Sequence, residues 1–509
     1  MTFLIQLKSR IYFSNKKMKE TKLIDLLKRL NKEEFKDFEK FTSSPYFSRG
    51  RDLSPLFKSL KPFYPDFENE KLTDEYIFMK LYPDKKFGNE KSVSLLRTLT
   101  SELFNLGKEF LAYSEFNQDI NRKNFYRLNQ LRKKKLYKDF EKEYKESVSI
   151  QEKSEGGNPE DFINKYFLRL SYAEYCVEKG WAVQAYESLF KMGDYAAMIT
   201  LIRGFRMSEL KMVAKSFCNL KPEFSLLEYL INNIDKEKLI DTIRLNENKY
   251  FPIIEISYLI HKMTEDFMNE EHFRKLKKLV LENLGLLGHD EKYMIFSIMG
   301  SYCVRMTNIL NLDSYLKEQF VLFDMSLKLG VLKWRQEDDF QLSLFRNIVI
   351  TGVIVNELEW VEEFIHKYSP ELNPDQRESM TNYSMAYLYA AKKNYDKALE
   401  YLIKVKYDFF MFKIDVKNLY FRIYFEMGHI EQAYSILDSM RHYISSTKDL
   451  YDIFIDRNTN FIKYASELLR IKSSGVYKNL DLLRNRIEKE VYLESRRWLQ
   501  KMIDELLNN

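Results

Sequence analysis

Glycine, proline and cysteine are scarce in this sequence of 509 residues, which holds 15 glycines, 10 prolines and three cysteines. Glycine and proline each fall below half of their usual shares of about 7% and 5%. Because sharp chain reversals depend on these residues, their scarcity excludes an all-β or collagen-like fold. Hydrophobic residues make up 45% of the chain and charged residues 31%, so there is enough apolar surface to fold. We therefore expect a large helical protein.

The three cysteines, Cys176, Cys218 and Cys303, are too far apart in sequence for a CxxC redox centre or a cysteine-rich zinc site. Uncharged stretches in the middle of the chain, such as residues 348–355, are far shorter than the roughly 20 residues of a membrane span. An apolar patch at residues 3–7 is shorter than the core of a secretory signal, roughly 7–15 residues. We expect a cytoplasmic protein with reduced thiols and no membrane partner.

Apolar residues recur at helical spacing from Thr21 onward, and no segment alternates strictly enough to predict a sheet. Asn31 and Glu34 form a capping-box pattern, and Asn158 precedes a proline at a predicted helix start. Gly156 and Gly157 lie in the one segment typical of a linker. The predicted fold is all-α, and its parts follow in chain order. They are a disordered extension or misplaced start before Met18 (1–17), a basic N-terminal helical module (18–155), an α-solenoid of helix-turn-helix repeats (156–475) and a C-terminal capping helix (476–509).

Positive charge is concentrated in the first 150 residues, which carry a net charge of +10 against −4 for the rest of the chain. The densest stretch, residues 122–138, holds eight basic residues and no acidic one, with aromatic residues among them. Such a surface could bind a phosphate backbone and stack on bases. The candidate residues are Arg127, Arg132, Lys133, Lys134 and Lys135. Acidic residues follow directly at 139–146, a pattern equally typical of a charge-paired, solvated helix face.

Two segments of the second half repeat with a spacing of 35 residues. The matching positions are Ala386, Tyr389, Tyr395, Ala398 and Leu402 in one, and Phe421, Tyr424, Ile430, Ala433 and Leu437 in the other. This pattern resembles the tetratricopeptide repeat, a helix-turn-helix unit of 34 residues. The resemblance implies two helices that approach closely at the alanines, with Gly428 at the turn between them. A weaker copy runs from Ala173 to Leu189 with Gly180 at its turn, and residues 204–356 match no copy.

Several other segments resemble the ends of uncharacterised bacterial helical-repeat proteins. They are residues 35–47, 72–75, 82–83 and 95–111 near the N-terminus and residues 497–502 near the C-terminus. That family has no assigned activity, so this resemblance implies ordered helical structure in these regions and supplies no site residue.

Motifs that carry chemistry are missing from the sequence: it has no glycine-rich phosphate loop, no GxSxG turn, no HExxH helix and no EF-hand loop. Glu363–His366 and Glu426–His429 match half of a di-iron motif, but His429 follows a predicted turn, so we interpret both as chance. We expect His261 to make a surface hydrogen bond with Glu265. The sequence thus predicts no catalytic residue, no metal, no cofactor and no enzymatic activity.

The leading hypothesis is a non-enzymatic scaffold that binds a peptide or a partner helix on the concave face of the helical array. The repeat register places Tyr383, Tyr387, Asn418 and Arg422 on that face, and we predict these four residues as partner contacts. Packing against neighbouring helices is the alternative for each of them. A nucleic-acid-binding or regulatory protein that acts through the basic N-terminal third is the alternative function, with residues 73–82 and 90–111 as a helix-turn-helix variant. A homodimer through the last helix also stays open.

Overall fold

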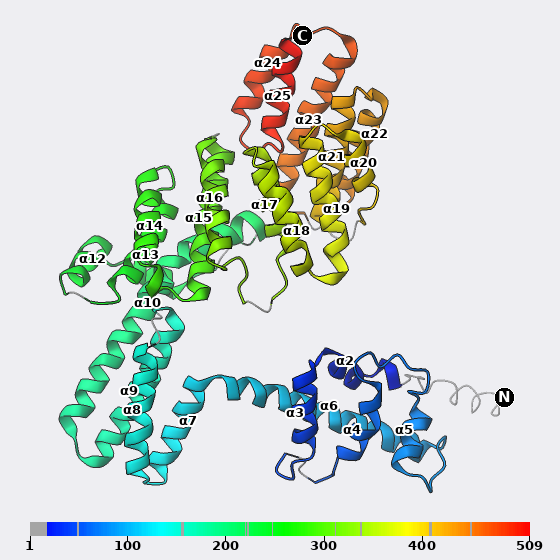
Figure 1. Cartoon of the computed structure of the whole chain (residues 1–509). Coiled ribbons are helices and arrows are strands. Elements are labelled where there is room, and N and C mark those ends of the chain that lie inside the picture. The colour runs from blue at the N-terminus through cyan, green and yellow to red at the C-terminus, as the bar shows by residue number, and fades with distance from the viewer. Residues whose placement is uncertain are drawn as a thin grey trace, which may run out of the picture. The chain divides into compact units, whose positions relative to one another are not determined.

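The structure is a computed structural model, and it describes residues 18–47, 50–153, 157–218, 220, 223–246, 248–310, 312–335, 338–406, 410–447 and 450–508 (Figure 1). Within these residues all regular structure is helical, apart from one isolated bridge between Phe340 and Leu372. The prediction of an all-α fold is confirmed. The predicted extension at residues 1–17 and Gly156 of the predicted linker lie outside the described residues.

The chain divides into two compact units, residues 1–147 and 148–509, and the division falls within helix α8 (Tyr137–Lys153). The sequence analysis placed a boundary slightly later, at residue 155. Each unit has its own core and is described separately.

The first unit is built around one long helix, α6 (Glu90–Gln118), against which the preceding helices pack. These are η1 (Met18–Glu20), α2 (Lys22–Arg29), α3 (Lys32–Thr42), α4 (Ser54–Leu60), η2 (Lys61–Phe63) and α5 (Asp74–Leu81), and α7 (Ile120–Lys133) follows. Leu99 and Leu103 of α6 are buried in a core with Phe38 and Phe57. The predicted capping box at the start of α3 is confirmed, since the Asn31 side chain accepts from the backbone N–H of Glu34 at 3.0 Å.

The second unit begins with a group of helices around α10 (Ala182–Cys218), which packs against α9 (Pro159–Lys179) and α13 (Phe251–Glu265). The others are α11 (Leu226–Asn232), α12 (Lys236–Leu245), α14 (Glu270–Glu282), η3 (Leu284–Leu286), α15 (His289–Leu310) and α16 (Ser314–Lys328). Gly180 ends α9 with φ of 73°, as expected for a turn glycine. At 37 residues α10 is much longer than a tetratricopeptide helix, so the weak third copy of the repeat continues into a different structure.

The remainder of the second unit consists of helical hairpins in chain order. They are α17 (Leu342–Ile354) with α18 (Leu358–Tyr368), α19 (Pro374–Ala391) with α20 (Tyr395–Leu402), α21 (Phe410–Met427) with α22 (Ile430–Ser446), and α23 (Asp452–Ser474) with α24 (Leu480–Lys489). The short η4 (Ser369–Glu371) follows α18, and α25 (Arg496–Leu507) ends the chain. Each hairpin turn holds a residue with positive φ: Asn356 at 66°, Lys393 at 57°, Gly428 at 78° and Gly475 at 68°.

The two segments that repeat in the sequence correspond to the hairpins α19–α20 and α21–α22. Ala398 and Ala433 are completely buried where the two helices of each hairpin pack together, as the pattern predicts. The buried apolar residues form successive clusters, one spanning α16 to α21 and the next α21 to α25. Contacts between consecutive elements, as opposed to a single central core, are typical of stacked helical arrays.

The predicted capping helix over residues 476–507 is wrong, because the structure breaks it into α24 and α25. Ser495, just before α25, adopts φ of 51°, which an α-helix cannot continue through. The buried Arg496 guanidinium donates to the carbonyl oxygens of Ile487 at 2.6 Å and Glu488 at 3.1 Å. It thereby satisfies acceptors that the end of α24 leaves open. The helical spacing of the apolar residues predicted one continuous helix and gave no sign of the contacts between Arg496 and the end of α24.

Gly352 in α17 allows a close approach to α18, and its replacement tests this packing. A Cβ atom at Gly352 would lie 2.5 Å from Cγ2 of Val361, a fully buried β-branched residue. We expect Gly352→Ala to destabilise the second unit by about 1–3 kcal/mol, measured by urea unfolding, and Val361→Ala to restore part of the loss. The matched control is Gly300→Ala in α15, where the Cβ meets nothing within 4 Å. Equal effects of the two substitutions would contradict this packing.

Candidate interaction site

Polar and aromatic side chains of four helices meet on one side of the hairpin array, which we call the inner face. The first helices of the four hairpins, α17, α19, α21 and α23, supply them: Arg346, Tyr387, Asp415, Asn418, Arg422, Glu426 and Arg457. Arg346 binds Asp415 through two hydrogen bonds, with Nη2 2.7 Å from Oδ1. Arg422 donates from Nη1 to the hydroxyl of Tyr387 at 3.0 Å. These contacts join α17 to α21 and α19 to α21, so the face is continuous across the hairpins.

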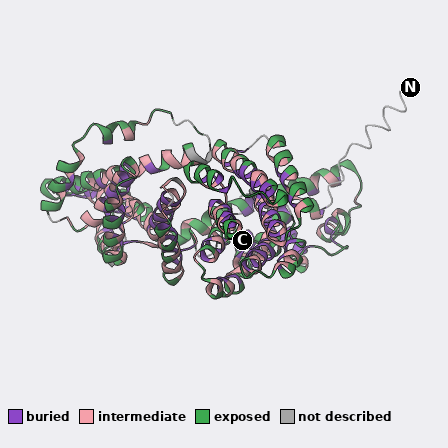
Figure 2. Cartoon of the chain, turned by 90° about the horizontal axis from the view of Figure 1, so that it is seen from above, coloured by how far each residue is buried: buried purple, intermediate pink, exposed green. Residues whose placement is uncertain are grey.

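The chain's own C-terminal segment, residues 490–507, covers this inner face. Helix α25 of this segment packs against α23 and α24, and Figure 2 shows buried residues in purple along the sides of helices that face other helices. Glu494 accepts a hydrogen bond from Nη2 of Arg457 at 2.8 Å, and its backbone N–H donates to the carbonyl oxygen of the same arginine at 3.2 Å. Ser495 donates from Oγ to Oδ1 of Asn418 at 3.3 Å. The segment therefore binds through both its backbone and its side chains.

Trp498 of α25 is the central contact between this segment and the inner face. Its indole N–H donates to Oε1 of Glu426 at 2.7 Å. The ring meets Phe421 and Phe425 edge-on, with centroids 5.6 and 5.2 Å apart. The guanidinium of Arg422 lies 5.7 Å from the same indole ring. An aromatic anchor in such a setting combines apolar burial, a hydrogen bond and a cation–π contact.

Two further contacts hold the part of the segment that precedes Trp498. Arg497 donates from Nε to Oδ1 of Asp313, directly before α16, at 2.9 Å. Asn460 of α23 donates to the carbonyl oxygen of Tyr492 at 2.9 Å. The segment thus reaches from the last hairpin back to a residue far earlier in the chain.

Without the C-terminal segment, the inner face has more positively than negatively charged side chains. Three guanidinium groups, those of Arg346, Arg422 and Arg457, face two carboxylates, those of Asp415 and Glu426. Burial raises the pKa of the Asp415 carboxyl above its usual value although Arg346 opposes the shift. The inner face alone therefore carries a surplus of positive charge.

Glu494 of the C-terminal segment supplies a third carboxylate to the inner face. Burial alone would raise the pKa of Glu494, but Arg457, Arg346, the backbone N–H of Ser495 and Arg422 together outweigh burial and lower the pKa below its usual value. The arginines that give the inner face its surplus of positive charge thus hold the Glu494 carboxylate in its charged form.

Two donors of the inner face have no hydrogen-bond partner among the described residues, namely Nδ2 of Asn418 and Nε of Arg422. Both atoms are buried, and a buried donor without a partner costs roughly 1–3 kcal/mol. The C-terminal segment therefore satisfies the inner face only in part.

The structure brings the four predicted partner contacts together, but it does not expose them. Tyr383, Tyr387 and Asn418 are buried, with exposed fractions of 2%, 7% and 6%, and Arg422 is half-buried. Tyr383 packs edge-on against Phe412 at 4.8 Å, so packing against neighbouring helices, the alternative in the sequence analysis, describes it. Neighbouring helices cover Tyr383 and Tyr387, and the C-terminal segment contacts Asn418 and Arg422, so their role as partner contacts stays a prediction.

Sequence reasoning missed Glu494 and Trp498 as inner-face residues. The sequence analysis included Arg497 and Trp498 only in a segment that resembles other helical-repeat proteins and in the predicted capping helix. Trp498 is one of four tryptophans in the chain, and a rare aromatic on an amphipathic terminal helix was the one signal that could have drawn attention to it.

The basic residues of the nucleic-acid hypothesis lie around the turn between α7 and α8. Arg127 donates to Oε2 of Glu143 at 2.9 Å, as the charge-paired alternative predicts. Arg132 is half-buried, whereas Lys133, Lys134 and Lys135 are exposed. Nucleic-acid binding stays a prediction.

Charge reversal of these three lysines tests that prediction. Because they are exposed, we expect their joint replacement by glutamate to change the free energy of unfolding by less than about 0.5 kcal/mol. If they bind a phosphate backbone, DNA or RNA affinity will fall steeply with salt and will be lost in the variant. Binding that is absent or insensitive to salt would eliminate the hypothesis.

The histidines offer no metal site. Glu363 and His366 lie on α18, whereas His429 precedes the first residue of α22 and Glu426 belongs to α21. Among the described residues no three His, Cys, Asp or Glu side chains are grouped to hold a metal ion.

The prediction of a surface hydrogen bond at His261 is wrong, because this residue of α13 is 3% exposed. Its Nε2 lies 3.1 Å from Oε1 of Glu265, and its Nδ1 lies 3.1 Å from Oγ of Ser208 in α10. Burial lowers the pKa of the imidazole although Glu265 opposes the shift. The sequence spacing of four residues was correct for the contact, but α10 covers this face of α13.

Buried ion pairs join α10 to α15 in the same region. Arg206 binds Glu291 with Nη2 2.8 Å from Oε2, and Arg305 lies 3.3 Å from Glu209. Each of these charges has its opposite, so the pairs position the two helices.

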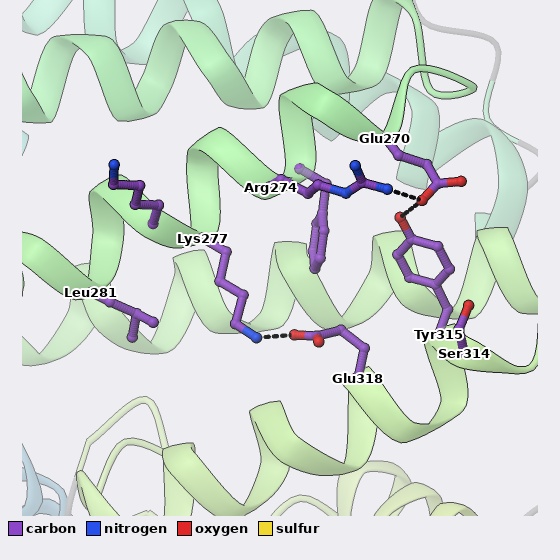
Figure 3. A pocket seen from close by; sticks show the side chains of 9 residues that line it. Glu270, Arg274, Lys277, Leu281, Ser314, Tyr315 and Glu318 are labelled. Carbon is purple, nitrogen blue, oxygen red and sulfur yellow. Dashed lines mark hydrogen bonds and ion pairs between the residues drawn. The ribbon is translucent and has the colours of Figure 1, made fainter.

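A pocket of about 560 Å³ lies between α14 and α16 (Figure 3). Most of its charged side chains bind one another: Glu270 accepts from Arg274 at 3.1 Å and from the Tyr315 hydroxyl at 3.0 Å, and Lys277 pairs with Glu318. Lys278, which also lines the pocket, pairs with Glu282 outside it. The lining thus combines ion pairs with the apolar side chains of Phe273 and Leu281.

Along the described parts of the chain, no helix is both long enough and apolar enough to cross a membrane. Comparison with protein-family models, curated protein sequences and solved structures found no match to this chain. The resemblance to tetratricopeptide repeats therefore stays a prediction.

Proposed function

We propose that this chain is a non-enzymatic protein-interaction scaffold whose hairpins form a tetratricopeptide-like solenoid and whose inner face holds a peptide or a partner helix. One observation carries the proposal: the inner face already holds a polypeptide segment, residues 490–507, by specific contacts. The unpaired, buried thiols of Cys176 and Cys303 are typical of a reducing compartment, and we propose that the protein acts in the cytoplasm.

The contacts to the segment are of the kinds that dominate protein interfaces. Tryptophan and arginine are the residues most enriched among those that contribute most to binding, and here Trp498 lies against Arg422. An amphipathic helix laid along a groove of helices is a recurring mode of peptide recognition. The inner face thus has the chemistry of a binding surface.

Site-specific photo-crosslinking tests the proposal. A benzophenone amino acid replaces Asn460 on the inner face in one version of the full chain. In the other it replaces Ser435, an exposed residue of α22. Both proteins are irradiated in lysate of the natural source and analysed by mass spectrometry.

We expect a partner protein to be crosslinked at residue 460 and not at residue 435. Crosslinks to other proteins that arise only at residue 435 would contradict binding at the inner face.

A further inference from the structure

We propose that the C-terminal segment, residues 490–507, is a displaceable internal ligand, which occupies the inner face in the free protein and yields it to a partner of matching chemistry. This inference rests on the proposed function and names its partner class. The partner is a polypeptide with an amphipathic helix that presents a tryptophan or another large aromatic side chain. Four residues before this side chain, and outside the helix, it carries a carboxylate.

The partner's pattern follows from the contacts of the internal segment. Glu494 supplies the carboxylate that the surplus guanidinium groups attract, and Trp498 supplies the indole that Glu426 and Arg422 bind. Beyond Trp498, the buried apolar residues of α25 extend along one helix face. They are Leu499, Met502 and Ile503.

Each buried apolar side chain contributes roughly 1.5–3 kcal/mol relative to its exposed form. A competing helix must therefore bring an apolar stripe of similar size. A short acidic peptide alone does not meet this requirement.

The internal segment is a separate element at the end of the chain. Residues 490–495 break the helix between α24 and α25, and Ser495 adopts a left-handed conformation that costs a non-glycine residue free energy. Asp313, the partner of Arg497, keeps 76% of its side chain exposed, so water can replace this ion pair readily.

The incomplete fit of the internal segment leaves room for a better ligand. Nδ2 of Asn418 and Nε of Arg422 stay without acceptors while the segment is bound. A partner that offers an acceptor at either atom gains a hydrogen bond that the internal segment lacks. Tethering gives the internal segment an effective concentration on the order of millimolar, so a free helix binds wild-type protein only weakly unless it makes such additional contacts.

The experiment uses the full chain and a fluorescent synthetic peptide of residues 490–508 as the probe, with binding measured by fluorescence anisotropy. One variant, Glu494→Gln with Arg497→Glu, weakens the internal segment and leaves the inner face unchanged. A second, Asn418→Cys with Ser495→Cys, can lock the segment by a disulfide, because the two native side chains lie 3.3 Å apart. The control is Lys501→Ala, an exposed position of α25. Circular dichroism verifies the helical content of each protein.

We expect the weakened variant to bind the probe at least tenfold more tightly than wild type, and the Lys501→Ala control to match wild type. The oxidised double-cysteine protein should not bind, and reduction should restore binding in the same sample. A probe peptide with Trp498→Ala should bind no variant.

Two results would overturn the inference, and they differ in what they say of the proposed function. Equal binding to the oxidised and reduced proteins would show that the peptide binds elsewhere and that the segment is a fixed part of the fold. Failure of the weakened and reduced proteins to bind would show that the inner face does not accept the segment from outside. In both cases crosslinking at residue 460 decides the proposed function independently.

Discussion

Replacement of Trp498 by alanine is expected to detach α25 from the inner face while the hairpins before it stay folded. The substitution removes the indole hydrogen bond to Glu426, the edge-on contacts with Phe421 and Phe425, and the contact with Arg422. Loss of a large buried aromatic side chain costs about 3–5 kcal/mol. That cost is large enough to populate the detached state of α25.

Amide hydrogen exchange measures this effect residue by residue. We expect the amides of α25 to exchange at least a hundredfold faster in the variant, with little change in α9, α10 and α13. Trp334→Ala is the matched control, since Trp334 is 47% exposed and contacts Tyr293 at the surface. Loss of protection throughout the second unit would contradict a detachable segment and would make Trp498 part of the common core.

Replacement of Arg346 by alanine is expected to destabilise the second unit in a pH-dependent manner. The substitution leaves the Asp415 carboxylate buried without its arginine, which costs about 3 kcal/mol when the acid is charged. The pKa of Asp415 is already raised in the folded protein, and loss of Arg346, the largest influence that lowers it, raises it further.

The sign of the pH dependence follows from this shift. A carboxyl whose pKa is higher in the folded than in the unfolded protein binds more protons when folded, so stability is lost as the pH rises through the interval between the two values. The destabilisation by Arg346→Ala should therefore be smaller near pH 5 than near pH 8 in urea unfolding. Asp415→Asn in the same chain should recover most of the loss. The same loss at both pH values, or no recovery, would contradict the ion pair's role.

Local features of the fold could be predicted from the sequence because they depend on neighbouring residues. The capping box of Asn31 and Glu34 closes within a single helical turn. Ala398 and Ala433 lie where their hairpins pack most closely, and the spacing of 35 residues made them recognisable. Lys393 takes the positive φ that Gly428 takes in the next hairpin, so the backbone turn persists without the glycine.

The pairing of Tyr387 with Arg422, 35 residues apart, was within reach of the sequence, since the repeat register put both on one face. The segment that covers this face could not be predicted from the sequence. Trp498 meets Glu426 across 72 positions of the chain, and Arg497 meets Asp313 across 184. No periodicity encodes such contacts, which depend on how the whole array returns its last helix to the inner face.

The most direct test of an exchangeable segment is fluorine NMR of the full chain labelled with fluorotryptophan, with the Trp498 resonance assigned by Trp498→Phe. The chain has four tryptophans, so four resonances are expected. Upon addition of excess unlabelled peptide of residues 490–508, the Trp498 resonance should move to the position of a solvent-exposed indole while the other three stay unchanged. A Trp498 resonance that stays in place while the peptide binds would contradict the account.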